Sequence, residues 1–135
     1  MKSDIKAPEK QGSSYKKDYE AKYRMGSKYN ATEVENEAKK LIELLKTNLK
    51  ISIPLGLSKI SIETKLNPIA LKGVYDRAVG AYATSGSRAG MSAEQWGYGR
   101  VYAFVMGYFN NRSGKYSSRR FMQNKTDYDL YLLCK

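Results

Sequence analysis

The stretch that most constrains this chain runs from Ser87 to Tyr108, SRAGMSAEQWGYGRVYAFVMGY. Ser92 and Gln95 have the spacing of a capping box, in which each side chain accepts a hydrogen bond from the other residue's backbone N–H. Beyond Trp96, which completes a hydrophobic staple with Met91, apolar and aromatic residues surround the helix axis and Arg100 is the only charge. Because such a helix is buried on most faces, the sequence predicts the core helix of a small domain.

Composition excludes several classes of site. The 135 residues suit one domain, and they include no histidine and one cysteine, Cys134. The usual ligands of zinc and the commonest general base are therefore missing, and we expect no metal and no cofactor. The apolar stretch is shorter than a bilayer requires and contains Arg100, so we expect no membrane span.

Positive charge is concentrated at the two ends of the chain. The net charge is +11, with net +4 in residues 1–31 and net +4 in residues 110–135, whereas residues 32–50 are neutral. An excess of this size favours a polyanionic partner.

Residues 1–31 are polar and lysine-rich, which predicts an extended basic N-terminal arm. Tyr15, Tyr19 and Tyr23 recur every fourth residue and would share one face of a short helix, beside Lys16 and Lys17. Three interpretations stay open for these residues. The rings pack on their own domain, dock on a neighbouring molecule, or stack on the bases of a single-stranded nucleic acid. With partner binding as the working hypothesis, deletion of residues 1–28 should leave a folded monomer.

Residues 32–135 are expected to form one globular domain. Thr32 and Glu35 predict the start of an amphipathic helix, whose apolar stripe continues to Leu49. From residue 49 the apolar period changes to two, which predicts two short strands, at 49–55 and 60–63, in a small hairpin. Asn67 and Pro68 predict the start of another helix, which should end near Thr84.

Beyond the core helix, residues 110–126 contain five basic residues and no acidic one, and we expect an exposed basic loop. A last apolar piece should return to the core, with Arg100 paired to Asp127 or Asp129 because a buried arginine needs an anionic partner. The predicted fold class is mainly α (α+β), a small three- to four-helix domain with a short β-hairpin and the basic arm.

Residues 73–130 resemble an uncharacterised domain found in proteins of tailed phages and of large DNA viruses of algae. The resemblance rests on a turn, a Ser cap, Gln-Trp, Arg-Val and an Asp-x-Asp-Leu sequence. The matching residues, to which we assign structural roles, are Arg88, Gly90, Ser92, Gln95, Trp96, Arg100, Asp127 and Asp129. The turn carries Ala89 where proline is usual, and the loop before Asp127 is long. The resemblance implies a viral setting and supplies no catalytic residues.

Two functions of different classes follow. The first is a virion-associated structural protein, a minor capsid or cement component, made in the host cytoplasm and binding other shell proteins through its arm and basic ends. The second is a nucleic-acid-binding protein without sequence specificity. Its contacts would come from Arg112, Lys115, Tyr116, Arg119, Arg120, Phe121 and Lys125.

An enzyme is the third class considered. Arg88, Glu94, Arg100, Asp127 and Asp129 would cluster if the last segment returned to the start of the core helix, and paired carboxylates beside arginines serve phosphate or glycosidic chemistry. The structural interpretation, in which the aspartates neutralise Arg100, is the simpler one. We therefore expect no enzymatic activity.

Overall fold

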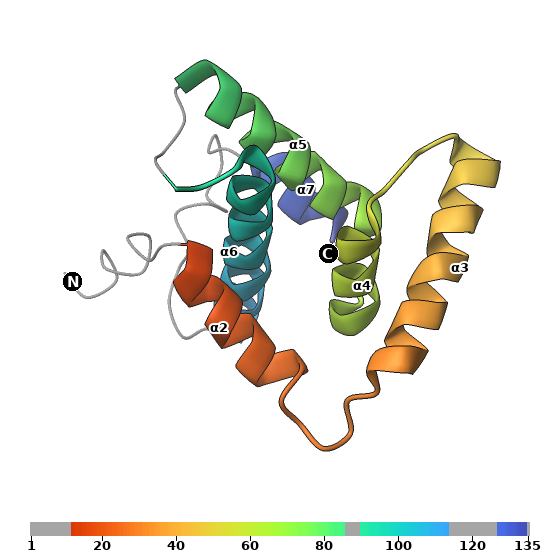
Figure 1. The fold of residues 1–135 in the computed structure, drawn as a ribbon. Helices are drawn as coiled ribbons and strands as arrows, with labels where there is room; N and C mark the ends of the chain where they lie inside the picture. The colour runs from red at the N-terminus through yellow and green to blue at the C-terminus, as the bar shows by residue number, and fades with distance from the viewer. Residues whose placement is uncertain (1–11, 86–89, 114–126, 135) are drawn as a thin grey trace.

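The computed structural model describes residues 12–85, 90–113 and 127–134, and these residues form six helices. In chain order they are α2 (Gly12–Tyr23), α3 (Ala31–Leu49), α4 (Leu55–Thr64), α5 (Pro68–Ser85), α6 (Ala93–Ser113) and α7 (Tyr128–Leu133). The main packing contacts run in the order α2, α6, α5, α4 and α3, and α7 lies on α5 (Figure 1).

The core helix was predicted correctly. Ser92 Oγ accepts from the Gln95 N–H at 3.1 Å, and Gln95 Oε1 accepts from the Ser92 N–H at 2.9 Å. Val101, Phe104 and Val105 in the middle of α6 are fully buried. Helix α5 approaches α6 at Gly97, where an added Cβ would lie 2.6 Å from a ring carbon of Tyr75. The helix therefore sits where its composition requires, with α5 on one side and α2 on another.

Two further helix starts were predicted, and one of the two caps is correct. Asn67 Oδ1 accepts from the Ile69 N–H at 2.8 Å, and α5 begins at Pro68 as expected. The predicted Thr32–Glu35 box is wrong, because Asn30 is the cap and its side chain accepts from the Glu33 N–H at 3.0 Å. Asn30 and Thr32 are both favoured N-cap residues, and Asn30, with Glu33 three positions on, takes the role two positions upstream.

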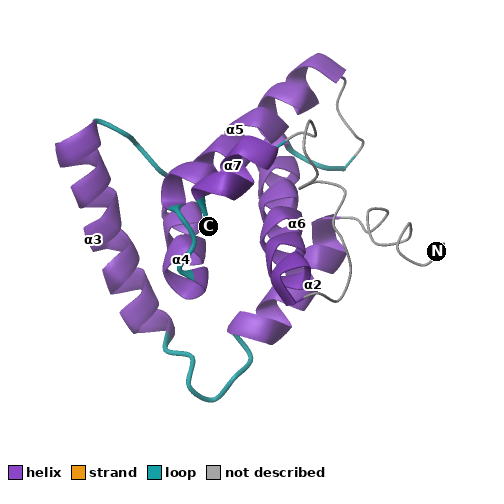
Figure 2. Ribbon diagram, turned by 180° about the vertical axis from the view of Figure 1, so that it is seen from behind, coloured by secondary structure: helices purple, strands orange, loops and turns teal. Residues whose placement is uncertain are grey.

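The predicted β-hairpin is wrong. Residues 55–64 form α4, and no strand is present in the described residues, which Figure 2 shows as helices and loops only. The buried face of α4 mixes Leu57 and Ile60 with hydroxyl residues. Ser58 donates to the carbonyl of Ala38 at 2.9 Å and Ser61 donates to that of Leu66 at 2.8 Å. Because these serines are satisfied by hydrogen bonds, they lie in the core, whereas the alternation of Ile and Ser in the sequence resembles a strand with one wet face.

The described part of the predicted arm is also not an extended arm. Residues 12–23 form α2, which packs along α6. Tyr19 is fully buried, and its ring lies 5.1 Å from that of Tyr102, between centroids. Tyr23 lies 6.0 Å from Phe109 in the same way. The first of the three interpretations is therefore correct for these rings, which pack on their own domain.

Candidate functional site: the ion-pair cluster where α5, α6 and α7 meet

Asp127 occupies the junction of the last helix with the rest of the molecule. Its backbone is left-handed, with φ of 72°, and its carboxylate is fully buried. Arg77 Nη1 of α5 lies 3.3 Å from Oδ1, and Arg100 Nη2 of α6 lies 3.6 Å from Oδ2. The predicted pairing of Arg100 with one of the two aspartates is confirmed, and Arg77 is a second partner that the sequence did not indicate.

Asp129 extends the cluster to the surface. Arg77 donates to both of its carboxylate oxygens, at 3.0 and 2.8 Å, in the bidentate geometry that arginine forms with carboxylates. The hydrogen bond from Arg77 lowers the pKa of Asp129 below its usual value, and the same bond raises the pKa of Arg77. A carboxylate held in its ionised form is poorly suited to act as a general acid.

The cluster therefore acts as a clamp on the end of the chain. Two arginines from α5 and α6 meet two aspartates that bracket the start of α7, so the charges balance. Apolar contacts support the clamp, since Leu130 packs directly on Gly73 of α5, where a Cβ would lie 2.9 Å from Leu130 Cδ1. Tyr108 of α6 donates to the backbone carbonyl of Cys134 at 3.0 Å.

This clamp fixes one end of the basic segment 110–126. The segment begins within the last turn of α6, and Arg112 lies in that turn. The side chains of residues 110–113 and the whole of residues 114–126 lie outside the described part of the structure, and so do Lys115, Tyr116, Arg119, Arg120, Phe121 and Lys125. Ser113 is 13 residues beyond Arg100 along α6, which corresponds to about 20 Å of helix axis.

The acidic residues that follow the basic segment form ion pairs with arginines of the helices. Asp127 and Asp129 come directly after a stretch that has no acid of its own, and both are paired with arginines of the helical body. The 29 residues outside the described ranges carry nine basic and two acidic side chains, which is +7 of the total charge of +11. The described helices themselves are close to neutral.

The predicted partner-binding residues of α2 divide into two groups. Lys16 and Lys17 are exposed, whereas Tyr19 is in the core and Tyr15 and Tyr23 are half-buried against it. The Tyr19 hydroxyl donates to Glu63 of α4, and burial followed by this hydrogen bond raises the pKa of Tyr19 above its usual range. Tyr19 is therefore unavailable to a partner while α2 is in place.

Glu63 is a second buried ion site that the sequence did not reveal. Its side chain is 2% exposed and accepts from Arg24 Nε at 2.8 Å and from Arg24 Nη2 at 3.0 Å. Glu63 lies in the segment 60–63 that was predicted to be a strand, and its local sequence does not indicate that it is buried. Through its hydrogen bonds with Tyr19 and Arg24, Glu63 joins α2 and the loop after it to α4.

The other residues with predicted structural roles are placed as follows. Gly90 has φ of 77°, a conformation that favours glycine at the turn before α6. Trp96 of the capping turn is half-buried and lies 6.4 Å from Tyr82 of α5, between ring centroids. Arg88 lies outside the described residues.

Two kinds of site are not found in the described part of the chain. No group of three or more His, Cys, Asp and Glu side chains there is arranged to hold a metal ion. Among the described helices, none is both long enough and apolar enough to cross a membrane.

Comparison with known proteins gives one match. The sequence profile of a family described as a family of unknown function (DUF5824) matches residues 5–126. No curated protein and no solved structure matches the chain. The match takes in α2 to α6 and the basic segment, and it ends just before Asp127, so α7 lies outside it.

Proposed function

The chain belongs to DUF5824, a family of unknown function, and from its own surface we propose that it is a virion-associated structural protein that binds neighbouring molecules through its basic segments. The viral setting is supported by the resemblance of residues 73–130 to the phage and algal-virus domain. The placement of charge carries the rest of the proposal.

The observation that most supports the proposed function is the ion-pair clamp at Asp127. A nearly neutral helical body holds the acidic residues that border the basic segment, so the positive charge of residues 114–126 is not offset by its nearest acids in sequence. A segment tied at both ends to a rigid body loses less conformational freedom on binding than a free tail. These features suit a small protein that joins larger components by electrostatic contacts.

The structure changes the route of binding that the sequence suggested. Tyr19 and Tyr23 contact rings of α6 and Tyr15 packs against the core, so shell binding would depend on exposed charges and not on those rings. Single-stranded stacking on the α2 tyrosines is dropped from the proposal for the same reason.

The test of virion association uses purified particles of the virus that encodes the chain. We expect mass spectrometry to detect the protein in gradient-purified particles, and cross-linking to join Lys115 or Lys125 to another shell protein. A protein that is abundant in infected cells but absent from the particles would contradict the proposal. Cross-links that involve only α3 would contradict the role of the basic segment.

Nucleic-acid binding is the second candidate, and it is favoured by the five basic residues of segment 110–126. If all five contact phosphates, affinity for duplex DNA should fall with salt with a log–log slope of up to about 4 to 5. The double variant Arg119→Glu with Arg120→Glu should lower that slope by about 2. The matched control, Lys46→Glu with Lys72→Glu, makes the same charge change on α3 and α5 and should leave most of the slope.

The result decides between the two candidates. An equal effect of both double variants would show that DNA responds only to net charge and would leave the shell-binding function ahead. Unchanged particle incorporation of the Arg119→Glu, Arg120→Glu variant would argue against the use of the segment in shell binding.

A further inference from the structure

Helix α3 lies at the edge of the molecule. It packs on α4 and has at most marginal contact with any other described helix, and Figure 1 shows it on the far side of α4 from α6. Ala38 and Leu45 are buried against α4, so the opposite face of this 19-residue helix points outward. That outward face has no counterpart within the described part of the chain.

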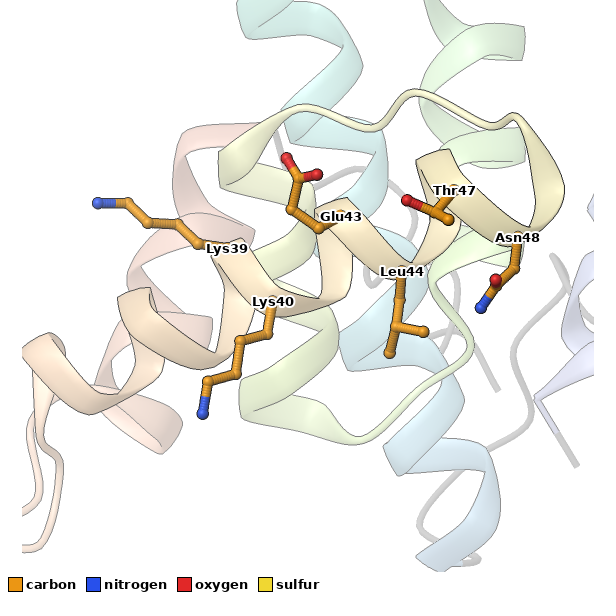
Figure 3. A pocket seen from close by; sticks show the side chains of 6 residues that line it. All are labelled: Lys39, Lys40, Glu43, Leu44, Thr47 and Asn48. Atoms are coloured by element: carbon orange, nitrogen blue, oxygen red, sulfur yellow. The ribbon is translucent and has the colours of Figure 1, made fainter.

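The outward face of α3 has an exposed leucine at its centre. Leu44 is 56% exposed, and a shallow pocket of about 510 Å³ is lined by Lys39, Lys40, Glu43, Leu44, Thr47 and Asn48. Figure 3 shows Lys40, Leu44 and Asn48, which are four residues apart, pointing to the same side of the helix. Lys40, Glu43, Leu44 and Thr47 have the i, i+3, i+4, i+7 spacing of one helix face.

The charges on this face are balanced and ordered. Residues 32–50 carry four acidic and four basic side chains, with three acids before residue 38 and all four lysines after it. Glu43 has no cation within 4 Å among the described residues, and Lys40 has only an exposed i,i+3 contact of 3.5 Å with Glu37. The helix dipole accounts for acids near the start of α3 and bases near its end, but it does not account for Glu43 or for the exposed Leu44.

We propose that this face of α3 is a self-association surface, on which α3 of a second copy of this chain packs antiparallel about a two-fold axis level with residues 41 and 42. In that register Lys40 of one copy faces Glu43 of the other, and by symmetry the pair occurs twice. Leu44 then covers the methylene stem of Lys40 in the second copy, which excludes water from both. The proposal does not depend on the basic segment or on the virion setting.

The charges of α3 indicate which kind of molecule would bind its outward face. A nucleic acid needs a net positive surface, and residues 32–50 have none. An antiparallel second copy brings the acidic half of one helix against the basic half of the other, which is the complementarity that an isologous interface requires. Because one helix pair buries less area than a standard interface, the dimer should be weak, with Kd of about 10 to 1,000 µM.

The test is a charge exchange measured by sedimentation velocity of the full chain over a range of concentrations. Wild type should show a monomer–dimer equilibrium. Lys40→Glu and Glu43→Lys should each raise Kd by about tenfold or more, since each change creates two like-charge contacts. The combined variant K40E/E43K restores opposite charges across the interface, and its Kd should return to within about threefold of wild type.

Lys72→Glu is the matched control, because it makes the same charge change at a lysine paired with an acid on the surface of α5. It should leave Kd within about twofold of wild type. Leu44→Ser should weaken the dimer without exchanging charge, and circular dichroism of each variant should show an unchanged helical spectrum. A wild-type chain that stays monomeric to 1 mM would overturn the proposal, and so would a dimer in which K40E/E43K is no better than the single variants.

Discussion

Tyr98 shows how one side chain joins two helices. It extends from α6 to the first turn of α4, where the end of its ring lies against the backbone of Gly56. The first turn of α4 has no side-chain cap of its own, because Pro54 occupies the cap position. Tyr98 therefore packs directly on the backbone of a helix turn that has no side-chain cap.

This contact requires glycine at position 56, and we predict that Gly56→Ala destabilises the fold. An added Cβ would lie 2.9 Å from Tyr98 Cζ and nearer still to its oxygen, so the ring must move and its packing on α4 is lost. We expect the free energy of unfolding in urea to fall by about 1 to 3 kcal/mol. Gly80→Ala in α5 is the control, since no atom lies within 4 Å of its added Cβ, and it should raise stability by about 0.5 to 1 kcal/mol. Equal effects of the two changes would show that Tyr98 does not restrict position 56.

A second prediction at the residue scale separates the two aspartates of the clamp. Asp127→Ala removes a fully buried carboxylate from two arginines, and we expect a loss of about 2 to 4 kcal/mol. Asp129→Ala removes an exposed carboxylate from Arg77, and its cost should be at most about 1 kcal/mol. Thermal or urea unfolding measures both. Similar costs for the two variants would contradict the assignment of Asp127 as the anchor.

At the scale of elements, the start of a helix was predicted correctly where the N-cap residue and its hydrogen-bond partner are close in sequence. Ser92 with Gln95 and Asn67 with Pro68 were identified from spacing alone, because the cap side chain and its acceptor or donor lie within three residues. The start of α3 was misassigned since Asn30 and Thr32 both satisfy the pattern, and only the path of the preceding loop selects between them. The burial of α6 followed from its apolar residues, whereas its last turn, residues 110–113, lies in the segment that was predicted to be a loop.

The misassigned elements are those decided by distant contacts. Helix α4 is held by the hydrogen bond from Ser58 to Ala38 of α3 and by the contact of Gly56 with Tyr98 of α6, and neither partner is near it in sequence. Burial of Tyr19 likewise depends on α6, about 80 residues away. Of the candidate site, the Arg100–Asp127 pair was predicted from the need of a buried arginine for an anion. Arg77 was not identified, because nothing in its local sequence distinguishes it from Lys72.

A prediction at this scale concerns α2. Deletion of residues 1–28 should destabilise the chain, contrary to the expectation from sequence, because it exposes Tyr102 and leaves Glu63 buried without Arg24. An uncompensated buried charge costs about 3 to 5 kcal/mol. Deletion of residues 1–11, which removes none of the described helices, is the control and should leave the unfolding transition in place. A cooperative transition of unchanged midpoint in the longer deletion would restore the view of residues 1–28 as a separate arm.

For the whole molecule, the distribution of ionisable groups sets the response to pH. The chain has no histidine, so few groups titrate between pH 6 and pH 9, and stability should change little across that range. Tyrosines are numerous, and several lie between helices that are distant in sequence. Burial raises the pKa of Tyr23 to about 12, and burial also raises the pKa of Tyr98 to about 12.

These raised pKa values predict unfolding at high pH. A phenol with an unfolded pKa of about 10 and a folded pKa of about 12 binds its proton more tightly in the folded state. Its contribution to stability is complete below pH 10 and is lost as pH rises through 12, at no more than about 1.4 kcal/mol per pH unit for each phenol. Urea unfolding at pH 8, 10 and 11 should show a falling midpoint, and Tyr98→Phe should reduce the slope between pH 10 and 11. The absorbance of tyrosinate should rise in the same transition as the loss of helical circular dichroism. Ionisation of Tyr23 and Tyr98 near pH 10 with the helices intact would show that these rings are solvated and that α2 and α4 are held to α6 by other contacts.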